Sequence, residues 1–85
     1  MTSLTIFIDA AQYASPRELH QALKMMLDLP DYYGCNADAL YDCLSERTGE
    51  PVSLCILNPG EGDVADALRK VVHVIEDLGG DTKLL

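Results

Sequence analysis

Residues 18–44 read "ELHQALKMMLDLPDYYGCNADALYDCL" and contain two helix patterns joined by a short loop. Ser15 and Glu18 have the spacing of a capping box, and Pro16 suits the first helical position, so the first helix is expected to begin there. Pro30 marks its end. Apolar residues recur every three or four positions between these points, which indicates an amphipathic helix; they are Leu19, Ala22, Leu23, Met26 and Leu27.

The second helix is expected over residues 36–46. Asn36 is a suitable N-cap, and Asp38 lies in the first turn, where the helix dipole favours a negative charge. Leu40 and Leu44 supply the inward-facing side of this helix.

Apolar runs on either side of this region predict strands. "LTIFI" (residues 4–8) and "VSLCIL" (residues 52–57) each predict a buried strand, and "TKLL" (residues 82–85) predicts a short last strand. A turn-rich loop at residues 58–62, expected to be the most mobile point, precedes a third helix for which Asp63 is the expected N-cap. The apolar stripe of this helix comprises Val64, Leu68, Val71, Val72, Ile75 and Leu78.

The resulting element order is β-α-α-β-α-β. Strands that are separated by helices favour parallel pairing with right-handed crossovers. The sequence therefore predicts a single α/β domain over residues 1–85, with a three-stranded parallel sheet covered by helices in a two-layer fold.

The charge of the chain is strongly acidic, with fourteen Asp and Glu residues against six Lys and Arg and a net charge of −8. Nucleic acid requires a basic surface, so it is not an expected partner, and an anionic membrane is disfavoured for the same reason. A basic protein is the partner that this charge favours, although solubility alone would also account for it.

The three cysteines, Cys35, Cys43 and Cys55, do not form a C-x-x-C pair. Their odd number argues against a disulfide framework and their spacing against a zinc site, so reduced thiols in a cytoplasmic protein are expected. The N-terminal apolar run has no preceding basic residue and is interrupted by Asp9, unlike a signal peptide.

A pair of aspartates, Asp38 and Asp42, falls one turn apart on the second predicted helix and so shares one face, flanked by Tyr41 and Ser45. Like charges at this spacing destabilise a helix by only a few tenths of a kcal/mol, so an ordinary solvated face explains the pair at least as well as a binding site does.

The same stretch closely resembles the barstar family of ribonuclease inhibitors. The resemblance consists of a helix with "LH", an "LP-acidic-YYG" loop and an "N-x-D-A-L-aromatic-D-C-L" helix, together with "GGD" before the last strand. It is carried in residues 18–44 by Leu19, His20, Leu29, Pro30, Tyr32, Tyr33, Gly34, Asn36, Asp38, Ala39, Leu40, Tyr41, Asp42, Cys43 and Leu44.

The resemblance implies that the loop and second helix plug the basic active site of a small secreted-type ribonuclease. By position, Asp42 is expected in the phosphate pocket and Asp38 on a flanking basic residue. A cofactor, a metal and catalysis are not expected, and the free protein is expected to be monomeric. The expected partner contacts are Tyr32, Tyr33, Gly34, Asn36, Asp38, Tyr41, Asp42, Ser45 and Glu46.

Departures from the family pattern bear on the identity of the partner. Tyr41 replaces a frequent tryptophan, and Arg47 replaces an aromatic residue and would repel a basic cleft. Val74 and Leu78 stand where the family prototype has acidic contacts, and the segment before the last helix is too short for one small helix of the prototype.

Two other interpretations remain open from the sequence. An acidic interaction module could bind another basic protein without inhibiting a nuclease. An enzyme or metal site at Asp38 and Asp42 is disfavoured, because two acids on one exposed helix face do not define a cleft. His20 is expected to pack between helices, His73 to be solvated, and Tyr33 either to contact the partner or to pack on the first helix.

Overall fold

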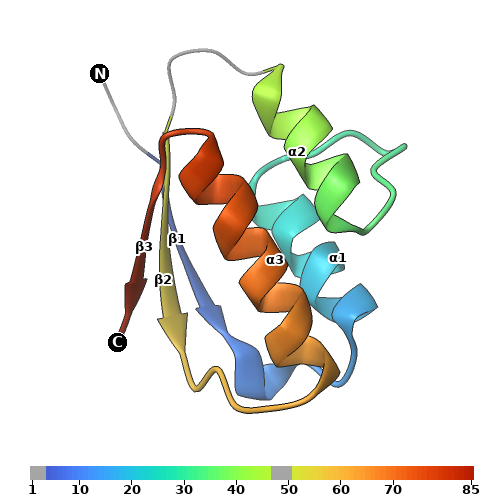
Figure 1. Cartoon of the computed structure of the whole chain (residues 1–85). Coiled ribbons are helices and arrows are strands. Elements are labelled where there is room, and N and C mark those ends of the chain that lie inside the picture. Colours follow the sequence, from blue (N-terminus) through green and yellow to red (C-terminus); the bar gives the residue numbers. More distant parts are fainter. Residues whose placement is uncertain (1–3, 47–50) are drawn as a thin grey trace.

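The computed structural model describes residues 4–46 and 51–85, and its elements follow the predicted order (Figure 1). They are β1 (Leu4–Asp9), a short 3-10 helix η1 (Ala10–Gln12), α1 (Pro16–Met26), α2 (Ala37–Ser45), β2 (Val52–Leu57), α3 (Asp63–Asp77) and β3 (Asp81–Leu84). The 3-10 turn was not anticipated from the sequence; it begins where the Asp9 carboxylate accepts a hydrogen bond from the backbone N–H of Ala11.

The sheet has three parallel strands in the order β1-β2-β3, as predicted. The register pairs Ile6 of β1 with Leu54 of β2, and Leu54 in turn with Thr82 of β3. β3 begins one residue earlier than expected, at Asp81, because its pairing with Ser53 extends the ladder to the end of the preceding turn.

All the described α-helices lie on one side of the sheet, and α3 contacts β2 and β3 as well as α1 and α2 (Figure 1). The inward side chains Ile6, Ile8 and Leu54 are buried, but Phe7 on the other face is 59% exposed. The apolar runs of β1 and β2 predict buried strands, and this prediction is correct for one face of the sheet only. Within residues 4–46 and 51–85 the fold therefore has two layers, and no helix covers the outer face of the sheet.

The ends of the helices show how closely local sequence controls the fold. The Ser15 hydroxyl accepts a hydrogen bond from the Glu18 backbone N–H at 3.3 Å, and the Glu18 carboxylate accepts one from the Ala14 N–H at 3.4 Å, so the predicted cap is present with its return bond displaced by one residue. The expectation that Asp63 caps α3 is wrong. Gly62 occupies the N-cap position with φ of 101°, a left-handed conformation that favours glycine, and Asp63 is the first helical residue.

Candidate functional site

The loop between α1 and α2 is fixed by two buried side chains. Leu29 and Tyr33 are 5% and 6% exposed, whereas Tyr32 between them is 78% exposed. A turn in which the Tyr33 N–H donates to the Pro30 carbonyl at 3.0 Å reverses the chain at this point. The two adjacent tyrosines consequently face in opposite directions, and only the Tyr32 ring is available to a partner.

Tyr33 is joined to α1 by a buried hydrogen bond. Its hydroxyl lies 2.6 Å from Nδ1 of His20, which is 4% exposed, and 3.4 Å from the carbonyl oxygen of Asn36. Burial lowers the pKa of His20 below its usual 6.5 and raises the pKa of Tyr33, so both groups are held in their neutral forms. Of the two roles weighed for Tyr33, the structure assigns its side chain to packing on the first helix, which positions the loop.

The start of α2 is organised by Asn36, whose side chain forms hydrogen bonds on both sides. Its Oδ1 accepts from the Ala39 N–H at 2.8 Å, and its Nδ2 donates to the Gly34 carbonyl at 3.2 Å. Asn36 is thus the predicted N-cap of α2 and also holds the preceding loop against the helix. Cys35 between these residues adopts a left-handed φ of 54°, which lets the chain turn into the helix.

The outer face of α2 carries acidic groups without partners. Asp38 and Asp42 are exposed, and neither carboxylate forms a hydrogen bond or ion pair with any residue of 4–46 or 51–85. Tyr41 beside them is 43% exposed. The opposite face of the helix is buried through Leu40 and Leu44, as predicted, so the acids are mounted on a helix that the core holds in place.

The end of α2 adds two exposed polar residues to this surface. The Ser45 hydroxyl donates to the Asp42 carbonyl at 3.0 Å, and Glu46 is the C-cap residue of the helix. Tyr32, Gly34, Asn36 and the α2 acids are all exposed on α2 and the loop before it, and we call this exposed part of the loop and helix the acidic face. Contact of these residues with a partner stays a prediction, and Arg47 lies outside the described residues.

Two residues for which the resemblance implies a position equivalent to acidic contacts, Val74 and Leu78, lie on α3 and at its C-cap. Val74 is 8% exposed and part of the core, and Leu78 is half-buried at the end of the helix. Val74 therefore cannot take over a partner contact without leaving the core, and any contact from this end of α3 must come from other side chains.

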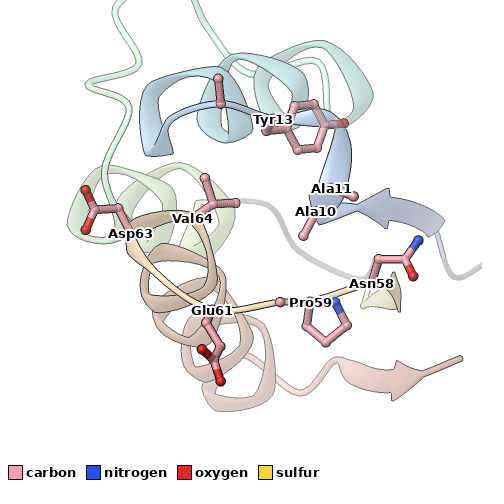
Figure 2. A pocket seen from close by; sticks show the side chains of 10 residues that line it. Ala10, Ala11, Tyr13, Asn58, Pro59, Glu61, Asp63 and Val64 are labelled. Carbon is pink, nitrogen blue, oxygen red and sulfur yellow. The ribbon is translucent and has the colours of Figure 1, made fainter.

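A separate pocket was not anticipated from the sequence. It has a volume of about 690 Å³ and lies where β1 and β2 end, beside the first turn of α3 (Figure 2). Its lining includes Tyr13, Asn58, Glu61 and Asp63. This edge of a parallel sheet is a common ligand site. Here, however, Figure 2 shows the Glu61 and Asp63 carboxylates pointing in different directions. The pocket therefore does not present a carboxylate pair for acid–base chemistry.

Metal-ligating clusters and membrane-spanning helices are both absent from the described part of the chain. It contains no group of three or more His, Cys, Asp or Glu side chains placed to hold a metal ion. None of its helices is long and apolar enough to span a membrane. Cys35, Cys43 and Cys55 form no disulfide.

The chain is a small two-layer α/β protein with exposed acids on α2, and comparison with known proteins identifies the family. The family model described as "Barstar (barnase inhibitor)" matches residues 4–83, almost the whole described chain. The protein belongs to the barstar family.

A curated relative points in the same direction. The chain is 45% identical over 86 aligned residues to a Bacillus subtilis (strain 168) protein named "Putative ribonuclease inhibitor YrdF", and the alignment covers 94% of each chain. The family match extends over β1, β2, α3 and most of β3, which all lie outside residues 18–44. The similarity is therefore not restricted to the stretch that carries the sequence motif.

Proposed function

We propose that this protein inhibits a small basic ribonuclease by inserting its acidic face into the active site of the enzyme. The observation that carries the proposal is the pair of exposed carboxylates, Asp38 and Asp42, that find no partner among the described residues. Membership of a family described as a barnase inhibitor supports a ribonuclease as the partner.

The chemistry of the two acids suits a cleft that normally binds phosphate. A carboxylate accepts two hydrogen bonds from an arginine in the geometry that a phosphate also accepts. Asp42 is proposed to occupy the phosphate pocket, and Asp38 to pair with a basic residue at its rim. Because α2 is anchored by Leu40 and Leu44, little conformational entropy is lost when the carboxylates dock.

The loop supplies the apolar part of the proposed contact. Tyr32 projects its ring into solvent, and an aromatic side chain beside buried charge pairs excludes water from them. Gly34 supports the same proposal, because a Cβ at this position would lie 3.4 Å from Asn36 Nδ2 and 3.5 Å from Ala39 Cβ, which the fold itself tolerates. The missing side chain at Gly34 is proposed to admit the surface of the partner.

The proposal also covers what the protein does not do. It acts by binding and not by catalysis, needs no cofactor, and, with a net charge of −8, binds neither nucleic acid nor an anionic membrane. Because its three cysteines form no disulfide, the protein suits a reducing, cytoplasmic compartment, in which an inhibitor of a secreted ribonuclease would protect the cell that makes the enzyme.

A titration of ribonuclease activity tests the proposal. Small basic ribonucleases are assayed against a fluorogenic RNA with increasing amounts of the protein, and one of them is expected to lose activity at a 1:1 ratio. Asp42→Asn should weaken inhibition strongly, whereas Glu61→Gln removes the same charge from an exposed loop outside the acidic face and serves as the matched control.

The assay also distinguishes the alternative of an acidic interaction module. Calorimetry with the same two variants shows whether a basic protein binds to the acidic face. Such binding, with no ribonuclease of the panel losing activity, would support the interaction module and overturn inhibition. Equal effects of Asp42→Asn and Glu61→Gln on inhibition would show that net charge alone is responsible, and would overturn the acidic face as the site.

A further inference from the structure

The described helices leave the outer face of the sheet uncovered (Figure 1). Two rows of side chains cross it, Thr5–Ser53–Asp81 and Phe7–Cys55–Lys83. Parallel sheets are normally covered on both faces, and here the helices cover only one. The uncovered face is the surface at which a further protein layer would complete the architecture.

The outer face carries both a protruding side chain and a hollow. Phe7 is 59% exposed and stands on β1 at one edge of the sheet. Next to it lies a hollow of about 410 Å³. Its floor includes the small side chains Thr5, Ser53 and Cys55, and Asp81 and Lys83 also line it. A protruding aromatic ring beside a hollow with a floor of small residues gives two copies of the face a way to interlock.

The charges of the outer face are also balanced. Its two rows carry one acid, Asp81, and one base, Lys83, on a chain whose overall charge is −8. Both side chains are exposed, and neither forms an ion pair with another described residue. The face is therefore close to neutral on an acidic protein, and its acid and base can pair with the base and acid of an identical surface.

We propose that two copies of this protein associate through their outer faces, each Phe7 ring entering the hollow of the other copy. Asp81 of one copy then lies near Lys83 of the other. Such an isologous contact uses the same surface twice and closes on itself. Only the three short strands of the described sheet contribute to this contact. We therefore expect the area buried on each partner to be below the roughly 800 Å² of a stable interface, so that the dimer forms only at high concentration. The free monomer expected from the sequence is then the dilute form.

The dimer does not compete with the proposed nuclease contact. The acidic face belongs to α2 and the loop before it, which the helical layer separates from the outer face of the sheet (Figure 1). Each copy in the dimer keeps Tyr32 and Asp42 exposed. The association is tested on the isolated protein without any nuclease, so its failure leaves the proposed inhibition unaffected.

Sedimentation velocity measures the association, from about 10 μM to about 1 mM, the range in which small interfaces associate. A reducing agent is present, so that thiols cannot link chains. The mass is expected to rise from monomer towards dimer with concentration. Phe7→Ser should weaken dimerisation at least about tenfold, because Phe7 provides the main apolar contact. Met25→Ser removes a side chain that is 84% exposed on α1 and should dimerise like the wild type.

Charge variants test the arrangement at exposed positions where folding is not at risk. Asp81→Lys places two lysines on the face and Lys83→Asp places two aspartates there, so each should dimerise less than the wild type. An equimolar mixture of the two variants should recover dimerisation, since each acid again meets a base. A monomer at every concentration overturns the proposal, and so does a dimer that persists unchanged in Phe7→Ser.

Discussion

The Nδ1 atom of His20 and the hydroxyl oxygen of Tyr33 lie 2.6 Å apart inside the core and link α1 to the loop of the acidic face. The rings are tilted by 52° with centroids 5.9 Å apart, so the contact combines a hydrogen bond with ring packing. The same hydroxyl reaches the Asn36 carbonyl, and Asn36 caps α2. One buried contact therefore fixes the relative position of Tyr32 and the two aspartates of α2.

Removal of the Tyr33 hydroxyl is expected to destabilise the protein. Tyr33→Phe keeps the ring but leaves His20 Nδ1 without its buried partner, which costs about 1–3 kcal/mol. Urea denaturation measures the loss in the free energy of unfolding. Tyr32→Phe changes an exposed ring and is the matched control, expected to unfold like the wild type. Equal stability of Tyr33→Phe and Tyr32→Phe would contradict the role of the hydrogen bond.

Stability is expected to decrease on mild acidification because of His20. Burial lowers the pKa of His20 in the folded protein below 6.5, so the unfolded chain binds the proton more tightly. The free energy of unfolding therefore falls as the pH drops below about 6.5, and it is insensitive to His20 at higher pH. Denaturation from pH 8 to pH 5 should show this slope in the wild type and a shallower one in His20→Asn.

Much of the fold follows from local sequence signals, but the assignment of side chains to the two faces of the sheet does not. Ser15 and Asn36 cap their helices as expected because capping depends on a few adjacent residues. "LTIFI" is apolar at every position but Thr5, so its period could not show that Phe7 faces solvent while Ile6 and Ile8 face the helices.

The candidate site could likewise be predicted only in part from the sequence, because some of its features depend on local patterns and others on tertiary contacts. The one-turn spacing of Asp38 and Asp42 placed both on one face of α2, because helical periodicity fixes it. The direction of Tyr33 depends on His20, thirteen residues away, and no local pattern in a loop encodes that contact. The N-cap at Gly62 was not predicted, because α3 begins after a glycine with a left-handed φ and has no side-chain capping hydrogen bond of the kind expected from Asp63.

The two faces of α2 should respond oppositely to truncation. Leu40→Ala removes a fully buried side chain and is expected to cost about 2–5 kcal/mol of stability. Asp42→Ala should leave stability unchanged or raise it by about 0.2–0.5 kcal/mol, since it relieves repulsion from Asp38. Thermal and urea unfolding measure both. Unfolding of the Asp42→Ala variant would mean that the aspartate is structural.

Two glycines should give contrasting results when each is replaced by alanine. At Gly80 a Cβ would fall on the Val52 carbonyl oxygen and 2.7 Å from Ile75 Cγ2, so Gly80→Ala should destabilise by about 1–3 kcal/mol or more. At Gly34 the nearest atoms are 3.4 Å away, so Gly34→Ala should retain stability and weaken inhibition only. Calorimetric melting of both variants and the ribonuclease titration separate the two effects. A destabilised Gly34→Ala variant would remove the argument for a partner at this position.

The last prediction separates specific docking from general attraction. A carboxylate that is hydrogen-bonded to a basic group of the nuclease contributes about 1.5–3 kcal/mol, so Asp42→Ala should speed dissociation by roughly 10- to 150-fold. Glu61 is exposed on the loop before α3 and acts only through its long-range field, so Glu61→Ala should slow association modestly, and less so as salt screens the field. Surface plasmon resonance with the inhibited nuclease, at low and physiological salt, measures both rates. If both variants changed only the association rate and to a similar extent, the acidic face would act through bulk charge and Asp42 would have no specific contact.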